Sequence, residues 1–381
     1  MASTVIVGSG LAGYTVAREA RKRNKADEII VVTQDDGHFY SKPVLSEVYR
    51  LGIPVNELVS RTAEEMARQF KGRVLADTKV LAIDPAARTL ALDRGSLGYD
   101  KLVLALGAEP AALPLDSESL GCLVTVNSLA DYRRFRQLAE GKKTIAIIGA
   151  GLIGCEFAND LVRAGYAVTV IDIAPLPLPR LLPDANGQYT YAALEGLGVR
   201  WHLGTGVAAL SRRGDSIAVA LSDGTQLTVD LVLAATGLRP RTELARRAGL
   251  QVAHGIAVNR ELRTSDRNIY ALGDCAEIGG LWLPYIAPIA PAARAVAASL
   301  AGGPQSISYP CMPVTIKTPA CPTVACPPAP RAEGRWHSIV ADDGVQSLFQ
   351  DSNGQLLGFA LSGAYAERAA ELAPALPALL H

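Results

Sequence analysis

The sequence has no long apolar run and no excess of charge of either sign. No stretch reaches the roughly 20 apolar residues that a membrane-spanning helix needs, and the first residues, MASTVIVGSGLAG, lack the positive n-region and separate apolar core of a secretory signal. The 37 Lys and Arg residues are balanced by 37 Asp and Glu residues, so no bulk charge attracts nucleic acid or an anionic membrane. We therefore expect a cytoplasmic protein with no membrane insertion and no nucleic-acid partner.

Cysteine and histidine are also sparse. The chain has six cysteines, namely Cys122, Cys155, Cys275, Cys311, Cys321 and Cys326. Scattered in this way through a long chain, they do not resemble a disulfide framework, and we expect reduced thiols. Cys321 and Cys326 have the C-x4-C spacing of a redox pair, but they lie in a proline-rich tail, and we interpret them as small apolar packing residues. The five histidines form no evident cluster, and we expect no metal site.

Apolar residues, in contrast, are plentiful. The chain is 49% hydrophobic and 19% charged over 381 residues, which is enough for several cores and two or three domains. It begins with a strand in STVIVG, a helix from Leu11 to about Asn24 and a strand in EIIVVTQ. The same plan returns as a strand over 144–148, a helix over 152–164 and a strand in AVTVID. The internal repeat is therefore a whole βαβ domain.

The segments between and after these units are less regular. A flexible polar stretch, QDDGHFYSKP, precedes a helix over TAEEMARQF and a pair of short strands in TKVLAIDPAARTLALD. A later helix covers APAARAVAASLAG. The tail from Pro310 begins with seven prolines in 21 residues, and we expect strands and a closing helix after them. This change of composition predicts a third, small domain.

A glycine fingerprint follows each repeat's first strand. Gly8, Gly10 and Gly13 have the G-x-G-x-x-G spacing between a strand and a helix, where one glycine forms the turn, one lets the backbone approach a pyrophosphate and one lets the helix pack on the strand. The fingerprint also requires an acidic residue about 20 residues later, at the end of the second strand. The sequence VVTQDD has no acidic residue at that strand end, and the nearest substitute is Asp35, two residues further on. Thr33 and Gln34 could contribute contacts instead, and Asp35 could equally be a solvated loop residue.

The second fingerprint is more complete. Gly149, Gly151 and Gly154 are followed, eighteen residues after the last glycine, by Asp172 at the end of AVTVID. A carboxylate there accepts hydrogen bonds from a ribose 2′-hydroxyl and repels a 2′-phosphate, and the next basic residue is Arg180. We therefore expect NADH rather than NADPH at this site.

The order of motifs resembles a known family. GSGLAG, LVLALGAEP, GAGLIGCEFA, LVLAATGLRP and YALGDCAE follow one another as in the flavoprotein oxidoreductases with two dinucleotide-binding domains. The segments FYSKPVLS, TGLRPRTELARRAGL and VTIKTPACP are similar to those of the rubredoxin reductases and flavorubredoxin reductases within that group. The resemblance extends along the whole chain and implies FAD and NADH as cofactors.

The resemblance also implies particular site residues. For FAD these are Gly8, Ser9, Gly10, Leu11, Ala12, Gly13, Thr33, Gln34, Asp35, Lys42, Pro43, Val80, Gly107, Glu156, Gly273, Asp274, Ile286 and Lys317. For NADH they are Gly149, Gly151, Leu152, Ile153, Gly154, Glu156, Asp172 and Gly237.

Some of these residues carry an implied role. Lys42 and Lys317 would lie against the flavin, where an ammonium group stabilises the anionic reduced form. Asp274 would bind the ribityl chain, and Glu156 would face both flavin and nicotinamide. Each lysine could instead be an ordinary surface charge, and Glu156 a solvated residue in a first helical turn.

The family's redox cysteines are missing. Related disulfide reductases have a C-x4-C pair after the first fingerprint, thioredoxin reductases have C-x2-C in the nicotinamide half, and peroxide-reducing relatives have one cysteine near PVLSE. Residues 40–47 read YSKPVLSE, and none of these cysteines is present. Electrons would therefore leave from the flavin to a one-electron iron protein, with no catalytic acid or base on the chain.

We predict an α/β protein with two Rossmann-like domains of the glutathione-reductase type and a small α+β C-terminal domain. FAD would bind residues 1–112 with 237–308, NADH would bind 113–236, and 309–381 would cap the flavin and help to bind the partner. The predicted function is NADH-dependent rubredoxin reduction by a monomer in electron transport. A ferredoxin reductase of an oxygenase system and a flavin-binding redox sensor without turnover remain alternatives.

The partner surface is the least defined feature. If the partner is acidic, basic residues could bind it, and the candidates are Arg239, Arg241, Arg246 and Arg247. The same cluster could be a solvated helix face.

Overall fold

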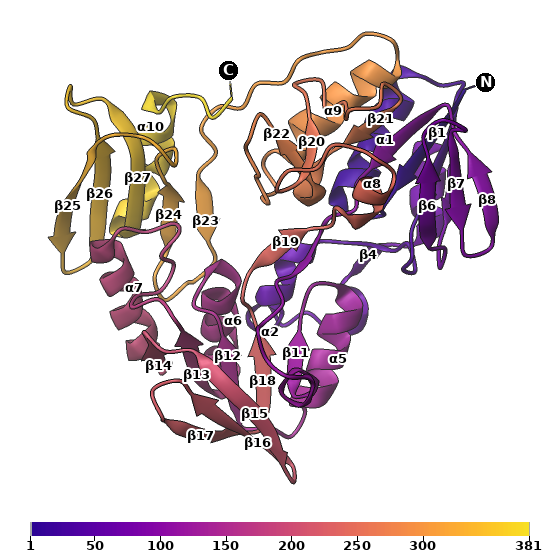
Figure 1. Ribbon diagram of the computed structural model, residues 1–381. Coiled ribbons are helices and arrows are strands. Elements are labelled where there is room, and N and C mark those ends of the chain that lie inside the picture. The colour runs from indigo at the N-terminus through magenta and orange to yellow at the C-terminus, as the bar shows by residue number, and fades with distance from the viewer. Residues whose placement is uncertain (1, 381) are drawn as a thin grey trace.

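The computed structural model describes residues 2–380 and contains two parallel sheets of the same design. The first has the order β21-β9-β1-β2-β5, and every neighbouring pair in it is parallel. Its strands are β1 (Ser3–Val7), β2 (Glu28–Val32), β5 (Arg73–Leu75), β9 (Lys101–Leu104) and β21 (Ile269–Ala271). Because β21 comes from much later in the chain, this unit is assembled from two separated stretches (Figure 1).

Helices and short antiparallel sheets complete the first unit. α1 (Leu11–Arg23) packs on α9 (Ile289–Leu300), and both belong to one apolar core with the sheet. The pair of strands expected in TKVLAIDPAARTLALD is a three-stranded antiparallel sheet in the structure. The further elements of this unit are β3 (Phe39–Tyr40), α2 (Val48–Leu51), β4 (Val59–Arg61), α3 (Ala63–Phe70), β6 (Val80–Asp84), β7 (Thr89–Leu92), β8 (Gly95–Gly98), α8 (Glu243–Arg247), β20 (Ile256–Val258) and β22 (Ala276–Ile278).

The second unit repeats the plan with the order β11-β18-β12-β13-β14. Its central strand β12 again leads into a glycine turn and a helix, α6 (Leu152–Arg163). The strands are β11 (Leu123–Thr125), β12 (Thr144–Ile148), β13 (Ala167–Asp172), β14 (Arg200–Leu203) and β18 (Leu231–Ala234). A β-meander and three further helices belong to it: β15 (Val207–Arg213), β16 (Ser216–Leu221), β17 (Gln226–Val229), α4 (Ser117–Gly121), α5 (Leu129–Ala139) and α7 (Asp184–Leu197).

The two connections between these units run side by side. β10 (Ala108–Pro110) pairs antiparallel with β19 (Leu238–Pro240), so the chain leaves the first unit and returns to it along the same path (Figure 1). We accordingly propose that the chain divides into 1–112 with 237–308, 113–236, and 309–381.

The C-terminal unit is an antiparallel sheet of order β23-β24-β27-β26-β25, which lies above the second unit and beside the first in Figure 1. Its strands are β23 (Val314–Ile316), β24 (Thr323–Cys326), β25 (Arg335–Ala341), β26 (Gly344–Gln350) and β27 (Leu356–Gly363). The expected closing helix is reduced to α10 (Ala369–Leu372) between 3₁₀ turns, because Pro374 and Pro377 follow directly and disfavour helical backbone before them.

The apolar cores follow this division only in part, because the second core also contains Leu45, Val48 and Leu58 of the first unit. One core contains β1, β2 and β9 with α1 and α9, and a second contains β12, β13 and α6. The second core extends into the C-terminal unit through Ile316, Ala325 and Ala360, so that unit shares a core with its neighbour. Among residues 2–380, no helix is long and apolar enough to cross a membrane.

Candidate functional site

The first glycine turn joins β1 to α1 and leaves the start of the helix free. Gly8 has φ of +115°, and a Cβ atom there would lie 2.2 Å from the carbonyl oxygen of Ala105. A Cβ on Gly13 would lie 1.9 Å from the Gly8 oxygen, so both positions require glycine. Gly10 has open space around its missing Cβ, and no side chain caps the helix that it begins. This turn has the shape and the free N–H groups that a pyrophosphate needs.

The second turn repeats this geometry. Gly149 has φ of +112° and a Cβ there would lie 2.4 Å from the Ala235 oxygen, while one on Gly154 would lie 1.8 Å from the Gly149 oxygen. Gly151 again faces open space and begins α6 without a side-chain cap. By contrast, Thr62 caps α3 and Ser128 caps α5. Both fingerprint helices therefore present uncapped N-termini, as an incoming phosphate requires.

Hydrogen bonds bring Asp35 to the first turn. Its Oδ1 accepts a hydrogen bond from Ser9 Oγ at 2.8 Å and another from Thr33 Oγ1 at 2.5 Å. The Ser9 and Thr33 hydroxyl oxygens lie 2.9 Å apart and both residues are buried. Asp35, although exposed like its neighbour Gln34, is therefore part of a polar network at the fingerprint.

Asp172 has the corresponding place in the second unit. Its Oδ2 accepts the Ala150 N–H at 2.6 Å, and its Oδ1 accepts the Ala174 N–H at 2.8 Å. These bonds fix the carboxylate next to the glycine turn, at the end of β13. The following residue, Ile173, is 81% exposed, so an apolar surface lies open beside the carboxylate.

Lys42 and Asp274 come together from distant parts of the first unit. Lys42 Nζ donates to Asn127 Oδ1 at 2.6 Å. Burial lowers the pKa of Lys42, and the nearby Asp274 carboxylate opposes this shift. Burial raises the pKa of Asp274, which the Lys42 ammonium in turn lowers. The two charges thus share one partly desolvated region.

A buried ion pair joins all three units. Glu156, only 1% exposed at the start of α6, accepts a hydrogen bond from Ser46 Oγ at 2.6 Å. Lys317, from the loop after β23, places its Nζ 2.9 Å from Glu156 Oε2, and its backbone N–H donates to Glu156 Oε1 at 3.1 Å. The same ammonium donates to the Pro43 carbonyl and lies 3.2 Å from Glu47. This cluster links the 3₁₀ helix η1 (Lys42–Ser46), α6 and the C-terminal unit.

The remaining predicted residues line the turns between these groups. Gly107 and Gly237 have positive φ just before β10 and β19, and Gly273 has φ of +73° with its missing Cβ 3.0 Å from Ala12. Ile286 is 51% exposed before α9. The other predicted positions occupy helix starts and a strand end: Leu11, Ala12, Leu152 and Ile153 at the starts of α1 and α6, and Val80 at the start of β6.

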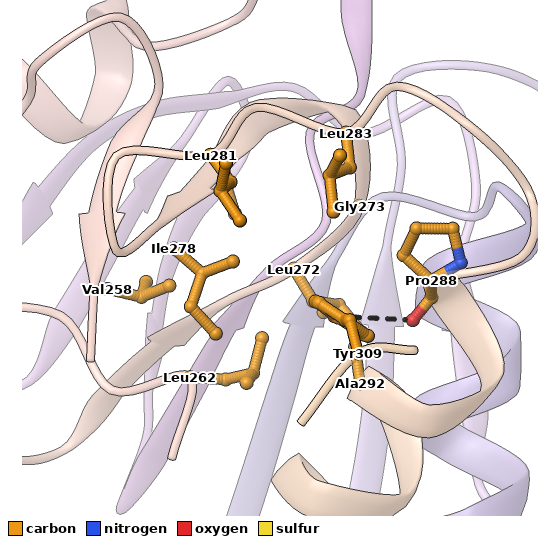
Figure 2. Close-up of a pocket in the computed structure, with 11 residues that line it drawn as sticks. Val258, Leu262, Leu272, Gly273, Ile278, Leu281, Leu283, Pro288, Ala292 and Tyr309 are labelled. Atoms are coloured by element: carbon orange, nitrogen blue, oxygen red, sulfur yellow. Dashed lines mark hydrogen bonds between the residues drawn. The ribbon is translucent and has the colours of Figure 1, made fainter. Parts of the chain in front are cut away.

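A small apolar pocket lies beside Leu272 and Gly273 (Figure 2). It is lined by residues from β20, β22 and the start of α9, and the Tyr309 hydroxyl donates to the Pro288 carbonyl at its edge. Gly273 is its one predicted site residue, and none of its lining residues is charged. We interpret it as a packing gap that supports the turn.

Sequence reasoning missed Ser46, Glu47 and Asn127. Each makes a hydrogen bond or ion pair with a predicted residue, namely Glu156, Lys317 or Lys42. Ser46 and Glu47 follow the FYSKP motif directly, but nothing local indicates that they meet α6 or the C-terminal unit. Asn127 lies in the other Rossmann-like unit, and we find no sequence signal for its contact.

Comparison with known proteins places this geometry in a family. A family model described as pyridine nucleotide-disulphide oxidoreductase matches residues 2–299. The chain belongs to this family. A second model, described as a rubredoxin binding C-terminal domain, matches residues 306–376, which include all five strands of the C-terminal sheet.

Individual relatives in the family match nearly the full chain. A rubredoxin-NAD(+) reductase of Alcanivorax borkumensis is 45% identical, with 99% of each chain covered. A rubredoxin-NAD(+) reductase of Acinetobacter baylyi is 42% identical over 95% of this chain and 94% of its own. The putidaredoxin reductase in a covalent complex with putidaredoxin has a TM-score of 0.87 at 28% identity, covering 99% of this chain and 94% of that one. The fold class predicted from the sequence is thereby confirmed.

Proposed function

We propose that this oxidoreductase is an FAD-dependent NADH:rubredoxin reductase. The observation that carries the proposal is the combination of two uncapped glycine turns with a C-terminal unit that matches a rubredoxin binding domain. FAD, when bound, accepts a hydride from NADH and returns electrons one at a time. The chain's own residues bind, orient and surround the reactants.

In this proposal the first unit holds FAD. The N–H groups of Leu11, Ala12 and Gly13 bind its pyrophosphate at the start of α1. The Ser9, Thr33 and Asp35 network would orient its ribose, and Asp274 would accept hydrogen bonds from its ribityl hydroxyls. These roles are supported by the open space at Gly10 and by the hydrogen bonds that already place Asp35 beside the turn.

Charge beside the flavin comes from two lysines. Lys42 hydrogen-bonds a neutral amide, and the Asp274 carboxylate nearby offsets part of its charge, so the remainder can stabilise negative charge on the reduced cofactor. Lys317 is already paired with Glu156 and Glu47, and its role is mainly to hold Glu156 and η1 in place. No proton transfer by a protein side chain is required.

The second unit selects NADH. Asp172 is fixed by two backbone N–H groups, and its charge beside the helix start of α6 repels a 2′-phosphate. Ile173 offers apolar surface to the adenosine. We also propose a cytoplasmic location, where NADH is supplied.

Stopped-flow absorbance tests the proposal. The purified yellow protein is mixed first with NADH and then with oxidised rubredoxin, and the flavin absorbance is followed. Rapid bleaching and then rapid reoxidation by rubredoxin is the expected result. If the reduced flavin is reoxidised only by a two-iron ferredoxin, the electron acceptor is a ferredoxin and not rubredoxin. If flavin is bound but neither carrier supports turnover, the protein is a redox sensor.

A further inference from the structure

Two of the six cysteines face each other in the C-terminal unit. The Sγ atoms of Cys311 and Cys326 lie 2.7 Å apart, with no bond between them. A disulfide S–S bond is about 2.0 Å long, so less than about one ångström of movement separates the pair from bond formation. The C-x4-C spacing singled out Cys321 as the partner of Cys326, but the fold places Cys311 there instead.

The other four thiols have different surroundings. Cys122, Cys155 and Cys275 each donate to a nearby backbone carbonyl, and Cys321 contacts the hydroxyls of Thr190 and Thr323. All four are buried, whereas Cys311 is partly exposed. The Cys311–Cys326 pair is therefore the one place, among residues 2–380, where two thiols hydrogen-bond each other with one of them open to solvent.

Their environment assigns different chemical roles to the two thiols. Cys326 ends β24 and is packed in the small apolar core with Phe359 and Leu361. The hydrogen bond from Cys326 lowers the pKa of Cys311, while the same bond and burial raise the pKa of Cys326. The partly exposed Cys311 is thus the better nucleophile, and Cys326 is placed to attack a mixed disulfide that forms on Cys311.

We propose that Cys311 and Cys326 form a reversible thiol–disulfide site for small disulfide oxidants of the glutathione class. The Cys311 thiolate attacks one sulfur of the oxidant and releases one thiol. Cys326, as its thiolate, then attacks the Cys311 sulfur, forms the protein disulfide and releases the second thiol. The two protein thiols lose two protons and two electrons, and the oxidant is reduced to two thiols.

The position of this bond gives it a structural consequence. It would close a loop that contains β23 and Lys317, the residue whose ammonium reaches Glu156 and Glu47. β23 is already paired with β24 through Val314 and Ala325, so the disulfide extends an existing hairpin without requiring a new arrangement. This site is separate from the proposed electron path, and its failure would leave the reductase proposal untouched.

Thiol titration and peptide mapping of the FAD-loaded protein test the site. After incubation with oxidised glutathione, the chain is denatured in the presence of excess alkylating reagent, so that buried free thiols also react, and is then digested with trypsin. The number of free thiols should fall from six to four, and peptides 295–317 and 318–331 should be linked with the loss of two hydrogens. Dithiothreitol should restore all six.

Variants distinguish this pair from the alternatives. Cys311→Ser and Cys326→Ser should each abolish the linkage. Peptide 318–331 contains both Cys321 and Cys326, and Cys321→Ser should leave the linkage intact, which excludes Cys321 as the partner of Cys311. Cys122→Ser is the matched control for loss of a buried thiol. Six free thiols after oxidation, a stable glutathione adduct without linkage, or a linkage that needs Cys321 would overturn the proposal.

Discussion

One carboxylate, Asp172, is expected to set the coenzyme preference of the second unit. We predict that Asp172→Arg raises the KM for NADH about ten- to a hundredfold and improves use of NADPH, because a charge-assisted hydrogen bond contributes about 1.5–3 kcal/mol and the repulsion of a 2′-phosphate is removed. Steady-state kinetics with both coenzymes measures the change. Asp215→Arg, the same charge reversal on an exposed turn of this unit, should leave both values near those of the parent. An unaltered preference in Asp172→Arg would remove that residue from the coenzyme site.

Lys42 and Lys317 differ in how much of their charge is already neutralised. The closest partner of Lys42 is the Asn127 amide, whereas Lys317 has carboxylates at 2.9 and 3.2 Å. We predict that both Lys42→Met and Lys317→Met lower the flavin midpoint potential. Lys42→Met should have the larger effect, about 30 mV, which for a two-electron couple corresponds to about 1.4 kcal/mol.

Spectroelectrochemical titration of the two lysine variants decides this point. Lys142→Met is a suitable control because Lys142 is partly exposed in the second unit and its ammonium donates to the Asp215 carbonyl rather than to any predicted flavin-site residue. A midpoint potential unmoved by either change would place both lysines outside the flavin's surroundings. A larger shift for Lys317 than for Lys42 would contradict the argument from partial neutralisation.

At the scale of single elements, the sequence predicts the helices and strands that have a recognisable pattern in their own residues. The helices expected over 11–24 and 152–164 are α1 (Leu11–Arg23) and α6 (Leu152–Arg163), because strand, glycine turn and amphipathic helix each leave a local signal. The stretch expected to be flexible, QDDGHFYSKP, instead leads into β3, η1 and α2, and no local pattern predicts these short elements. The Glu156–Lys317 pair likewise joins residues far apart in the chain, and only the resemblance to a family pointed to them.

The short helix α2 depends on α6 rather than on its own sequence. Both carboxylate oxygens of Asp160, which is 2% exposed, accept backbone N–H groups of α2, from Tyr49 at 3.1 Å and from Arg50 at 2.8 Å. We predict that Asp160→Ala lowers the free energy of unfolding by about 2–4 kcal/mol, since two buried donors lose their acceptor. Urea denaturation measures the loss. Removing the exposed cap of α4 by Asp116→Ala should cost only about 1 kcal/mol, and an equal loss in both variants would refute the claim.

Asp160 should also make stability depend on pH. Burial raises its pKa, although the N–H groups of Arg50 and Tyr49 oppose the shift. A carboxyl whose pKa is higher in the folded state contributes stability at low pH and loses it as the pH rises through that folded-state pKa. Relative to Asp160→Asn, the parent protein should therefore lose stability as the pH is raised above about 4, the unfolded pKa of aspartate. Denaturation of both proteins across this range should give a difference that declines with pH, and a flat or rising difference would exclude the shift.

At the scale of the whole molecule, the arrangement of the three units rests on buried polar contacts as well as shared apolar cores. The Glu156–Lys317 pair holds the C-terminal unit to α6 and η1. The basic cluster considered as a partner surface is only half neutralised, because Arg239 and Arg241 share Glu109, and Arg246 and Arg247 share Glu243. We infer that recognition of an iron carrier also depends on how the C-terminal unit, which matches a rubredoxin binding domain, is held beside the first two units.

The attachment of the C-terminal unit to the second unit can be tested at Asn186 on α7. It is fully buried, and its amide donates to the Val345 carbonyl and Ser362 Oγ while accepting from Ser347 Oγ, all on β26 and β27. We predict that Asn186→Ala removes one hydrogen bond from each of these groups, although Ser347 keeps Ser338 and Ser362 keeps Thr323 as partners. The substitution should cost about 1–3 kcal/mol and speed amide hydrogen exchange of β26 and β27 about five- to a hundredfold.

Exchange monitored by mass spectrometry localises the effect of Asn186→Ala. Asn353→Ala, in the exposed turn between β26 and β27, is the matched control, since the Asn353 side chain makes no hydrogen bond there. If the C-terminal unit is held through Asn186, protection should fall in that sheet and remain high in β1, β2 and α1. The rate of flavin bleaching by NADH should then change less than the rate of reoxidation by rubredoxin, because the glycine turns stay in place while the proposed partner surface moves. Equal loss of protection throughout the chain would mean that Asn186 supports the general fold and not the attachment of this unit.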